Sequence, residues 1–212
     1  MFLLFAKGGP VMWPLLVASL LGMTVVLERI LFIVRQKRSE NPELRKKIFF
    51  CVEAGDMEQA LQKGLDSKDW IVQMLVEGLQ HPASLQTTLL SAASDQLKKI
   101  NRGISVLDTI ITLAPLLGLL GTVTGMIGAF GLLGAQELDA PSAITGGIAE
   151  ALIATAFGLG TAIFCLIPFN GLNSYSENAR HEMEQAGSTL EVLIAKLPKA
   201  KESFYENTPS LH

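Results

Sequence analysis

The hydrophobic and polar positions of the chain alternate between three long apolar runs and two polar segments. Residues 109–133 carry no charge over 25 positions, and residues 151–176 form a second uncharged run. Residues 11–34 are apolar except for Glu28 and Arg29. An apolar run of about 18 residues or more is typical of a membrane-spanning helix, because about 20 residues at about 1.5 Å each cross the hydrocarbon layer. The pattern predicts three transmembrane helices, over 11–34, 104–134 and 144–173.

The polar segment 35–103 has the signals of a short series of helices. Asn41, which precedes a proline, is predicted to begin one helix, and Gly55 is predicted to end it. Asp56 is predicted to begin a second helix. A third is predicted to begin at Pro82 and to run without interruption into the second span, because its leucines recur at helical spacing.

The segment that follows the third span is predicted to be a helix as well. Its apolar residues recur at spacings of four and three, as on the seam of a coiled coil: Ala179, Met183, Ala186, Leu190, Leu193 and Leu197. This helix is predicted to cover 174–198 and to be followed by a disordered tail over 199–212. The predicted fold class is therefore an all-α integral membrane protein, with long cytoplasmic extensions of the second and third transmembrane helices.

Small residues form a stripe on each of the last two spans. Spacings of three and four place the members of each stripe on one helix face: Gly118, Gly121, Gly125 and Gly128 on the second span, and Ala151, Thr155, Gly158 and Ala162 on the third. Such stripes let helix backbones approach closely in a membrane, so the two spans are predicted to be mutual partners. Pro115 is predicted to break the second span, because it cannot donate to the carbonyl of Ile111. Leucine at Gly121 or Gly125 is expected to break or swell an oligomer.

Composition agrees with a membrane protein, and charge predicts its orientation. The chain is 49% hydrophobic and 17% charged, with a mean hydropathy of +0.38. Its net charge of −3 argues against a nucleic-acid partner, and Cys51 and Cys165 argue for neither a disulfide nor a metal site. Lys and Arg are concentrated in 35–103 and absent from 135–143, so the positive-inside rule places 35–103 and the C-terminus in the cytoplasm. The lead 1–10 and the loop 135–143 are then outside. A signal peptide is the alternative for the first span, but no convincing cleavage site follows it.

The sequence shows no constellation of an enzyme. No nucleophile stands near a plausible base, and no glycine-rich phosphate loop follows a strand. The histidines are scattered in polar segments, at His81, His181 and His212. We therefore predict neither catalysis nor a cofactor nor a bound metal.

Ion chemistry remains, with three candidate residues. If the helix starts near Ser142, just after Pro141, Glu150 is expected about eight residues, or about 12 Å, into it, where a carboxylate is costly in lipid and should face protein or a water-filled cavity. The alternative for Glu150 is a carboxylate that reaches the outer headgroups. Thr122 and Thr155 are candidates for hydroxyls in a proton pathway, and the alternative for each is a bond to the carbonyl four residues earlier in its own helix. A candidate ion-pair cluster at the inner ends of the spans consists of Glu28, Arg29 and Asp108.

The same residues carry a family resemblance. The stretches LAPLLGLLGTVTGMIGAF (113–130) and GIAEALIATAFGLGTAI (147–163), with LERILF (27–32) and GDMEQA (55–60), resemble the MotA/TolQ/ExbB family of proton-channel motor subunits. The three predicted spans favour its ExbB/TolQ branch over the four-span flagellar type.

The resemblance implies a homopentamer in the bacterial inner membrane. Its pore would hold the single-span helices of an ExbD- or TolR-like partner, which acts through a TonB- or TolA-like transducer. By position in the motifs, Thr122 and Thr155 match the family's pore threonines, Glu150 its third-span glutamate and Pro115 its second-span proline. The chain departs from the family at Phe164, where a proline is usual; Pro168 follows one turn later, and Phe169 replaces a tyrosine.

These observations lead to three functional hypotheses. The first is a motor subunit driven by the proton-motive force, the second a scaffold that assembles partner proteins without conducting, and the third a small-solute carrier. Three spans without an inverted repeat disfavour the carrier. If the motor hypothesis holds, valine at either threonine should abolish energised function and leave assembly intact. Glutamine at Glu150 should impair function, and aspartate should impair it less.

Overall fold

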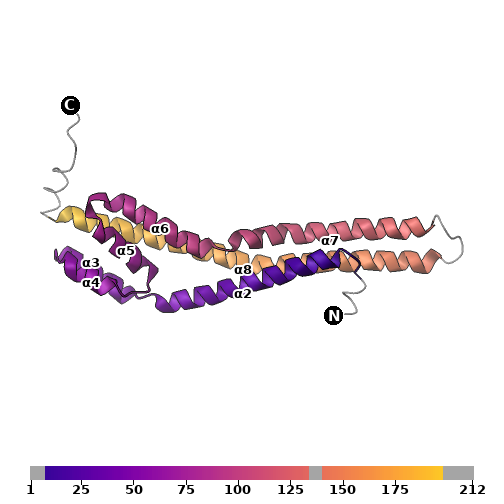
Figure 1. Ribbon diagram of the computed structural model, residues 1–212, viewed down its shortest axis with the longest axis horizontal. Coiled ribbons are helices and arrows are strands. Elements are labelled where there is room, and N and C mark those ends of the chain that lie inside the picture. Colours follow the sequence, from indigo (N-terminus) through magenta and orange to yellow (C-terminus); the bar gives the residue numbers. More distant parts are fainter. Residues whose placement is uncertain (1–7, 134–139, 198–212) are drawn as a thin grey trace, which may run out of the picture. The chain divides into compact units, whose positions relative to one another are not determined.

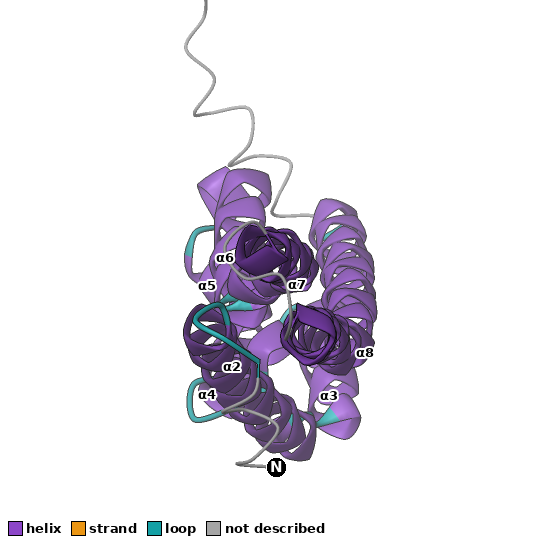
Figure 2. Cartoon of the chain, turned by 90° about the vertical axis from the view of Figure 1, so that its right-hand side faces the viewer, coloured by secondary structure: helices purple, strands orange, loops and turns teal. Residues whose placement is uncertain are grey.

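The computed structural model describes residues 8–133 and 140–197, and this part of the chain is helical with no strand (Figures 1 and 2). The predicted lead 1–10 in large part, most of the predicted loop 135–143 and the predicted disordered tail 199–212 lie outside it. The helices, in chain order, are α2 (Met12–Ser39), α3 (Pro42–Glu53), α4 (Met57–Gly64), α5 (Trp70–Gln80), the 3₁₀ turn η1 (Pro82–Ser84), α6 (Leu85–Asn101), α7 (Ile104–Leu133) and α8 (Ala140–Lys196).

Three stretches of helix are long and apolar enough to cross a membrane. They lie within Met12–Ser39, Pro82–Gly131 and Thr145–Lys196, and each contains a strongly apolar 18-residue window. The second of these ranges covers η1, α6 and α7, with a turn at residues 102–103. The prediction of an all-α membrane protein with three membrane-spanning helices is therefore confirmed.

Side-chain caps explain where the short helices begin. Asn41 Oδ1 accepts a hydrogen bond from Leu44 N at 3.1 Å, and Asp56 Oδ1 accepts one from Gln59 N at 2.9 Å. Both cap free N–H groups of a first helical turn, as the sequence predicted. Gly55, between α3 and α4, has a φ of +80°, which a residue without a Cβ adopts at little cost.

The second span does not continue without interruption from Pro82, so that prediction is wrong. The α-helix α6 ends at Asn101 and α7 begins at Ile104. Between them Gly103 has a φ of +82°, and a Cβ on it would lie 3.0 Å from Cγ1 of Val25. A glycine in the left-handed conformation commonly ends a helix. Gly103 was such a signal in the sequence, but the regular spacing of the apolar residues before it favoured an uninterrupted helix. The helix α7 itself runs through Pro115, so the predicted break there is not observed.

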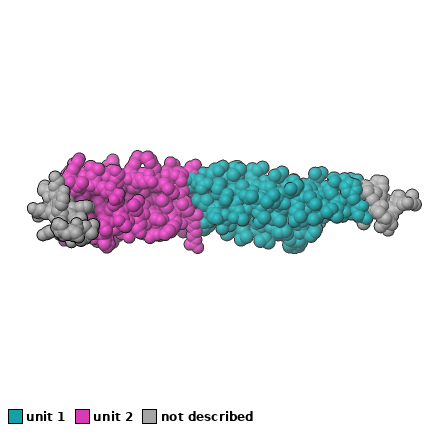
Figure 3. All heavy atoms as spheres, turned by 90° about the horizontal axis from the view of Figure 1, so that it is seen from above, with its two compact units in different colours: residues 1–31, 103–173 teal, residues 32–102, 174–212 magenta. Residues whose placement is uncertain are grey.

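The chain divides into two compact units, which Figure 3 distinguishes by colour. Unit 1 comprises residues 1–31 and 103–173, and unit 2 comprises residues 32–102 and 174–212. The helices α2 and α8 contribute to both.

Unit 1 has a small core and a large apolar surface. Its core joins the start of α2 to α7 and α8, through Val11, Met12, Leu15, Ala114 and Ala154. Many large apolar side chains of α2 and α7 are exposed, among them Trp13, Leu20, Leu27, Leu116, Leu119 and Ile127. A soluble monomer rarely exposes so much apolar surface, whereas lipid covers it in a membrane.

Unit 2 has a conventional core between α3, α4, α5, α6 and the C-terminal part of α8. Its largest buried side chains include Ile48, Val52, Trp70, Leu75 and Leu89. The seam predicted for 174–198 contributes Ala179, Met183, Ala186 and Leu190, which are all buried. A helix seam at spacings of four and three thus supplies one wall of a folded helical bundle.

An ion pair that the sequence did not predict lies in unit 2. Arg45 donates from Nε to Oδ2 of Asp69 at 2.8 Å and from Nη2 to Oδ1 at 3.1 Å. The third nitrogen, Nη1, donates to Oε2 of Glu182 at 3.1 Å. Asp69 is fully buried and also caps α5 by accepting from Ile71 N. Burial lowers the pKa of Arg45, but the hydrogen bonds and charges of Asp69 and Glu182 outweigh burial and raise it.

Replacing Arg45 with glutamine is expected to lower the free energy of unfolding by about 2 kcal/mol, because a buried carboxylate then loses its counter-ion. Urea unfolding of the full chain in detergent, followed by the fluorescence of Trp70, measures this loss. The control Glu43→Gln breaks an exposed pair with Lys46, 3.0 Å apart, and is expected to cost less than about 0.5 kcal/mol. Equal losses in the two variants would show that the buried pair has no special role.

Candidate functional site

The two small-residue stripes meet in unit 1, where α7 and α8 lie side by side (Figure 1). A Cβ on Gly118 would lie 3.0 Å from Cα of Thr155 and 3.2 Å from the carbonyl oxygen of Ala154. One on Gly158 would lie 2.5 Å from the carbonyl oxygen of Ala114. These atoms belong to the backbone and cannot rotate away, so only glycine permits this approach.

The contact continues toward the other end of α7 with small side chains. A Cβ on Gly121 would lie 2.6 Å from Cβ of Ala154, and one on Gly125 would lie 3.0 Å from Cβ of Ala151. Gly147 of α8 extends the contact, and the sequence analysis missed it although it stands four residues before Ala151. A Cβ on Gly128 would meet nothing within 4 Å among the described residues, so no close contact of Gly128 is seen in the described part of the helix pair.

The two candidate threonines make different hydrogen bonds. Thr155 Oγ1 donates to the carbonyl oxygen of Gly118 on α7 at 2.8 Å. Thr122 Oγ1 donates to the carbonyl oxygen of Leu119, in its own helix, at 2.7 Å. Thr122 therefore bonds within its own helix, to the carbonyl three residues back and not four, whereas the bond of Thr155 goes to the neighbouring helix. Each hydroxyl oxygen keeps a lone pair that can accept a further hydrogen bond.

Thr122 lines an open apolar groove between α7 and α8, of about 720 Å³. The other lining residues are Val123, Met126, Ile127 and Phe130 of α7, with Ile148, Ala151 and Leu152 of α8. Thr122 supplies the hydroxyl of this lining. Thr155 is seven residues beyond Ile148 and therefore lies on the same face of α8, since seven residues are close to two helical turns. The fold thus brings Thr122 and Thr155 to one side of the helix pair.

Glu150 lies elsewhere. It is two residues from both Ile148 and Leu152, so it lies about 160° around α8 from these two lining residues, and about 100° from the third, Ala151. A methyl group on Gly9, in the turn before α2, would overlap its carboxylate oxygen Oε1. Glu150 is half-buried there, and within one chain it does not join the two threonines.

The candidate ion-pair cluster forms in part. Arg29 is buried, and its Nε donates to Oε2 of Glu28 at 2.9 Å. Asp108 is exposed and takes part in no ion pair within the described residues; its backbone carbonyl accepts from Thr112 Oγ1 at 3.1 Å. The structure therefore joins Glu28 to Arg29 and leaves Asp108 outside the pair.

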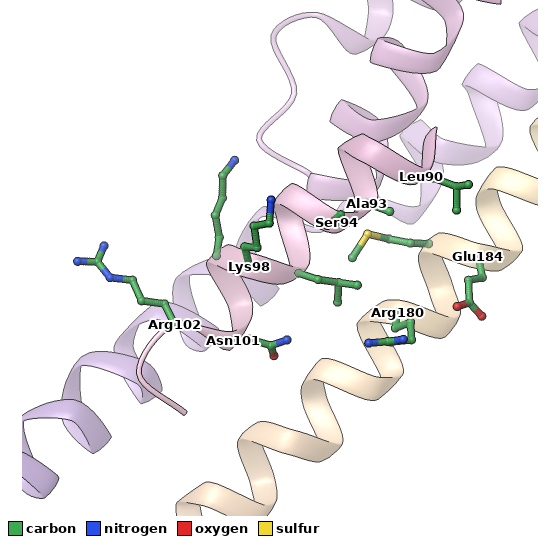
Figure 4. Close-up of a pocket in the computed structure, with 11 residues that line it drawn as sticks. Leu90, Ala93, Ser94, Lys98, Asn101, Arg102, Arg180 and Glu184 are labelled. Carbon is green, nitrogen blue, oxygen red and sulfur yellow. The ribbon is translucent and has the colours of Figure 1, made fainter. Parts of the chain in front are cut away.

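A second groove lies in unit 2, between α6 and α8 (Figure 4). Lys98 and Asn101 of α6, Arg102 immediately after α6 and Arg180 of α8 are among its lining residues. The sequence analysis missed it, because its two walls are about 80 residues apart in the chain. Neither groove holds a metal-ligand set: in residues 8–133 and 140–197 no three His, Cys, Asp or Glu side chains gather as ligands of one ion.

Comparison with known proteins agrees with this arrangement of long apolar helices. The sequence model of the MotA/TolQ/ExbB proton channel family matches residues 54–185. The chain is 36% identical to the biopolymer transport protein ExbB-like 1 of Synechocystis, over 91% of this chain and 78% of the relative. It is 35% identical to ExbB-like 3 of the same organism, over 79% and 82%. It is also 37% identical to the Tol-Pal system protein TolQ of Pseudomonas aeruginosa, over 41% of this chain and 37% of that protein. The chain therefore belongs to the MotA/TolQ/ExbB proton channel family.

Proposed function

We propose that this chain is the ring-forming subunit of a motor driven by the proton-motive force. Five copies would surround the single-span helices of an ExbD- or TolR-like partner in the inner membrane of a bacterium. The complex would conduct protons inward and energise work in the periplasm or at the outer membrane, through a TonB- or TolA-like transducer. Family membership and the names of the relatives, which are biopolymer transport and Tol-Pal proteins, support this assignment.

The observation that carries the proposal is the hydroxyl pair on one side of the α7–α8 contact. Thr122 lines an otherwise apolar groove, and Thr155 lies on the face of α8 that carries the lining residue Ile148, two helical turns away. A partner carboxylate on this face would be poorly solvated when charged, so it would favour protonation there. Each of the two hydroxyls keeps a lone pair that can accept, so a protonated partner carboxyl group, or a bound water, could donate a hydrogen bond to it.

The energy for work would come from the proton itself. Each charge moved across the membrane releases about 2.3 kcal/mol per 100 mV. Repeated protonation of the partner carboxylate would shift it between equivalent positions around the ring, because each form prefers a different environment. No cofactor is needed for such a cycle.

The proposed orientation follows from charge. Eleven Lys and Arg residues lie in 35–102 and four follow residue 176, whereas 135–143 has none. Basic loops stay in the cytoplasm, so unit 2 would be cytoplasmic and the N-terminus periplasmic.

Reconstitution separates the motor from the alternative, a scaffold that does not conduct. Liposomes containing the chain and its single-span partner are expected to take up protons when a membrane potential is imposed, as reported by a trapped pH dye. Liposomes with the chain alone serve as the control. A stable complex whose proton flux equals that of empty liposomes would contradict the motor and leave the scaffold.

A further inference from the structure

The turn before α2 lies directly on Glu150. Gly9 has a φ of +72°, and its carbonyl oxygen accepts a hydrogen bond from Met12 N at 3.2 Å. A Cβ on Gly9 would overlap Oε1 of Glu150 and lie 2.9 Å from Cδ and 3.3 Å from Cγ. The neighbouring Gly8 is buried, and a Cβ there would lie 3.4 Å from Cγ2 of Ile153. The Gly8–Gly9 turn therefore covers one edge of α8 at Glu150 and Ile153.

This edge is the one that α2 covers, and not the one that lines the groove. Phe157, seven residues after Glu150 and so on the same face, packs against the core of Val11, Met12 and Leu15. The groove-lining Leu152 is about 160° away around the helix. Glu150 is thus separated from the threonine groove by the body of α8.

The surroundings of this carboxylate are largely apolar. The turn immediately precedes the first turn of α2, in which Met12 N donates to the carbonyl oxygen of Gly9 and Trp13 N to that of Pro10. The core residues beside it, Val11, Met12 and Leu15, are apolar. Glu28, the nearest charged residue along α2, is 16 residues beyond Met12, or about 24 Å along the helix.

We infer that Glu150 acts apart from the threonine groove, beneath the Gly8–Gly9 turn, and that Gly9 positions its carboxylate. This deepens the proposed function, on which its functional part rests: the outer acid would exchange protons on the α2 face of α8, and the threonines would serve the partner on the other face. Gly9 is required twice, for its positive φ and for the absence of a Cβ beside Oε1.

Chemical labelling tests the contact without relying on function. A protonated carboxyl group adds across one C=N bond of dicyclohexylcarbodiimide. The acyl group of this adduct then shifts from oxygen to nitrogen and gives a stable N-acylurea, which contains all atoms of the carboxylic acid and of the carbodiimide. Gly9→Ala should displace the turn and raise the rate of labelling at Glu150 about tenfold, since a non-glycine residue at positive φ adds strain to the overlap. Peptide mass spectrometry of the full chain in lipid measures the rate. The matched control is Gly55→Ala, which imposes the same φ penalty, at +80°, far from any carboxylate contact.

Proton flux with the partner then tests the positioning role. Gly9→Ala is expected to reduce flux about tenfold, and Gly55→Ala to leave it unchanged. Glu150→Asp shortens the side chain by one methylene and withdraws the carboxylate by about 1.5 Å, which makes room for a methyl group at Gly9. The double variant Gly9→Ala/Glu150→Asp should therefore conduct better than Gly9→Ala alone, a non-additive result that a general loss of stability does not produce.

The outcomes separate this inference from the proposed function. A wild-type complex without flux would overturn the function, and the labelling rates would still decide the contact. A conducting wild type whose Gly9→Ala variant labels and conducts like Gly55→Ala would overturn the inference alone. Faster labelling of Gly9→Ala with unchanged proton flux would overturn the positioning role. A double variant whose loss of flux equals the product of the losses of the two single variants would overturn it too.

Discussion

Leucine in place of Gly158 is expected to abolish the packing of α7 on α8. The Cβ alone would lie 2.5 Å from the carbonyl oxygen of Ala114 and 3.2 Å from Cα of Gly118, and both atoms are backbone. The helices would have to separate. Overpacking of this kind usually costs about 1–3 kcal/mol. The separation would also remove the close contacts that drive helix association in lipid. The unfolding temperature of the chain in detergent, with the oligomer distribution by native mass spectrometry, measures the loss.

Gly160→Leu is the matched control, because it lies on the same helix and a Cβ there meets nothing within 4 Å. It should unfold at the wild-type temperature.

The same reasoning changes the meaning of Gly121→Leu and Gly125→Leu, which the sequence predicts to disturb an oligomer. Both glycines contact α8 of their own chain, so any loss of the oligomer would follow from loss of the helix pair. If Gly158→Leu unfolded like Gly160→Leu, the α7–α8 contact would be wrong.

Valine in place of Thr155 is expected to abolish proton flux through the complex with its partner. Valine keeps the shape of threonine and removes the hydroxyl, so the partner carboxylate or its water loses a hydrogen-bonding group in an apolar place. The lost bond to the Gly118 carbonyl should cost only about 0.6 kcal/mol, the average for such bonds between membrane helices. Flux into liposomes should therefore fall to background while the oligomer and the unfolding temperature stay close to wild type.

Two further variants make this test specific. Thr155→Ser restores the hydroxyl and should recover flux. Thr161→Val removes a hydroxyl that donates to the carbonyl of Phe157 in the same helix, at 2.9 Å, and should leave flux unchanged. A Thr155→Val complex that assembles and conducts like wild type would reduce the Thr155 hydroxyl to a packing role and favour the scaffold.

Much of the fold followed from patterns that are local in the sequence. Uncharged apolar runs form membrane helices, because backbone groups without hydrogen bonds are not tolerated in lipid. The three spans could therefore be predicted from these runs alone. Asn41 and Asp56 began helices as predicted, since a cap acts within one turn. The error at Gly103 arose from the same kind of local information, because a strong apolar period outweighed one glycine that ends a helix.

Residues with distant partners could not be placed in this way. The buried pair of Arg45 and Asp69 joins residues 24 positions apart, and each looks like an ordinary surface charge in the sequence. Asp108 was grouped with Glu28 and Arg29 by depth alone, and depth does not say which way a side chain points.

The sequence by itself determined the class of protein, the number of spans and the small-residue faces, because hydrophobicity and helical period are properties of single segments. Only the tertiary structure decided what those faces touch. It directed Gly118, Gly121 and Gly125 to α8 of the same chain, whereas Gly128 makes no such contact with the residues that the structure describes. It also set Thr122 and Thr155 on one side of the helix pair and Glu150 on another, beneath Gly9. The physical reason is that a helix offers several faces at once, and the partner of each is chosen by close packing between segments far apart in the chain.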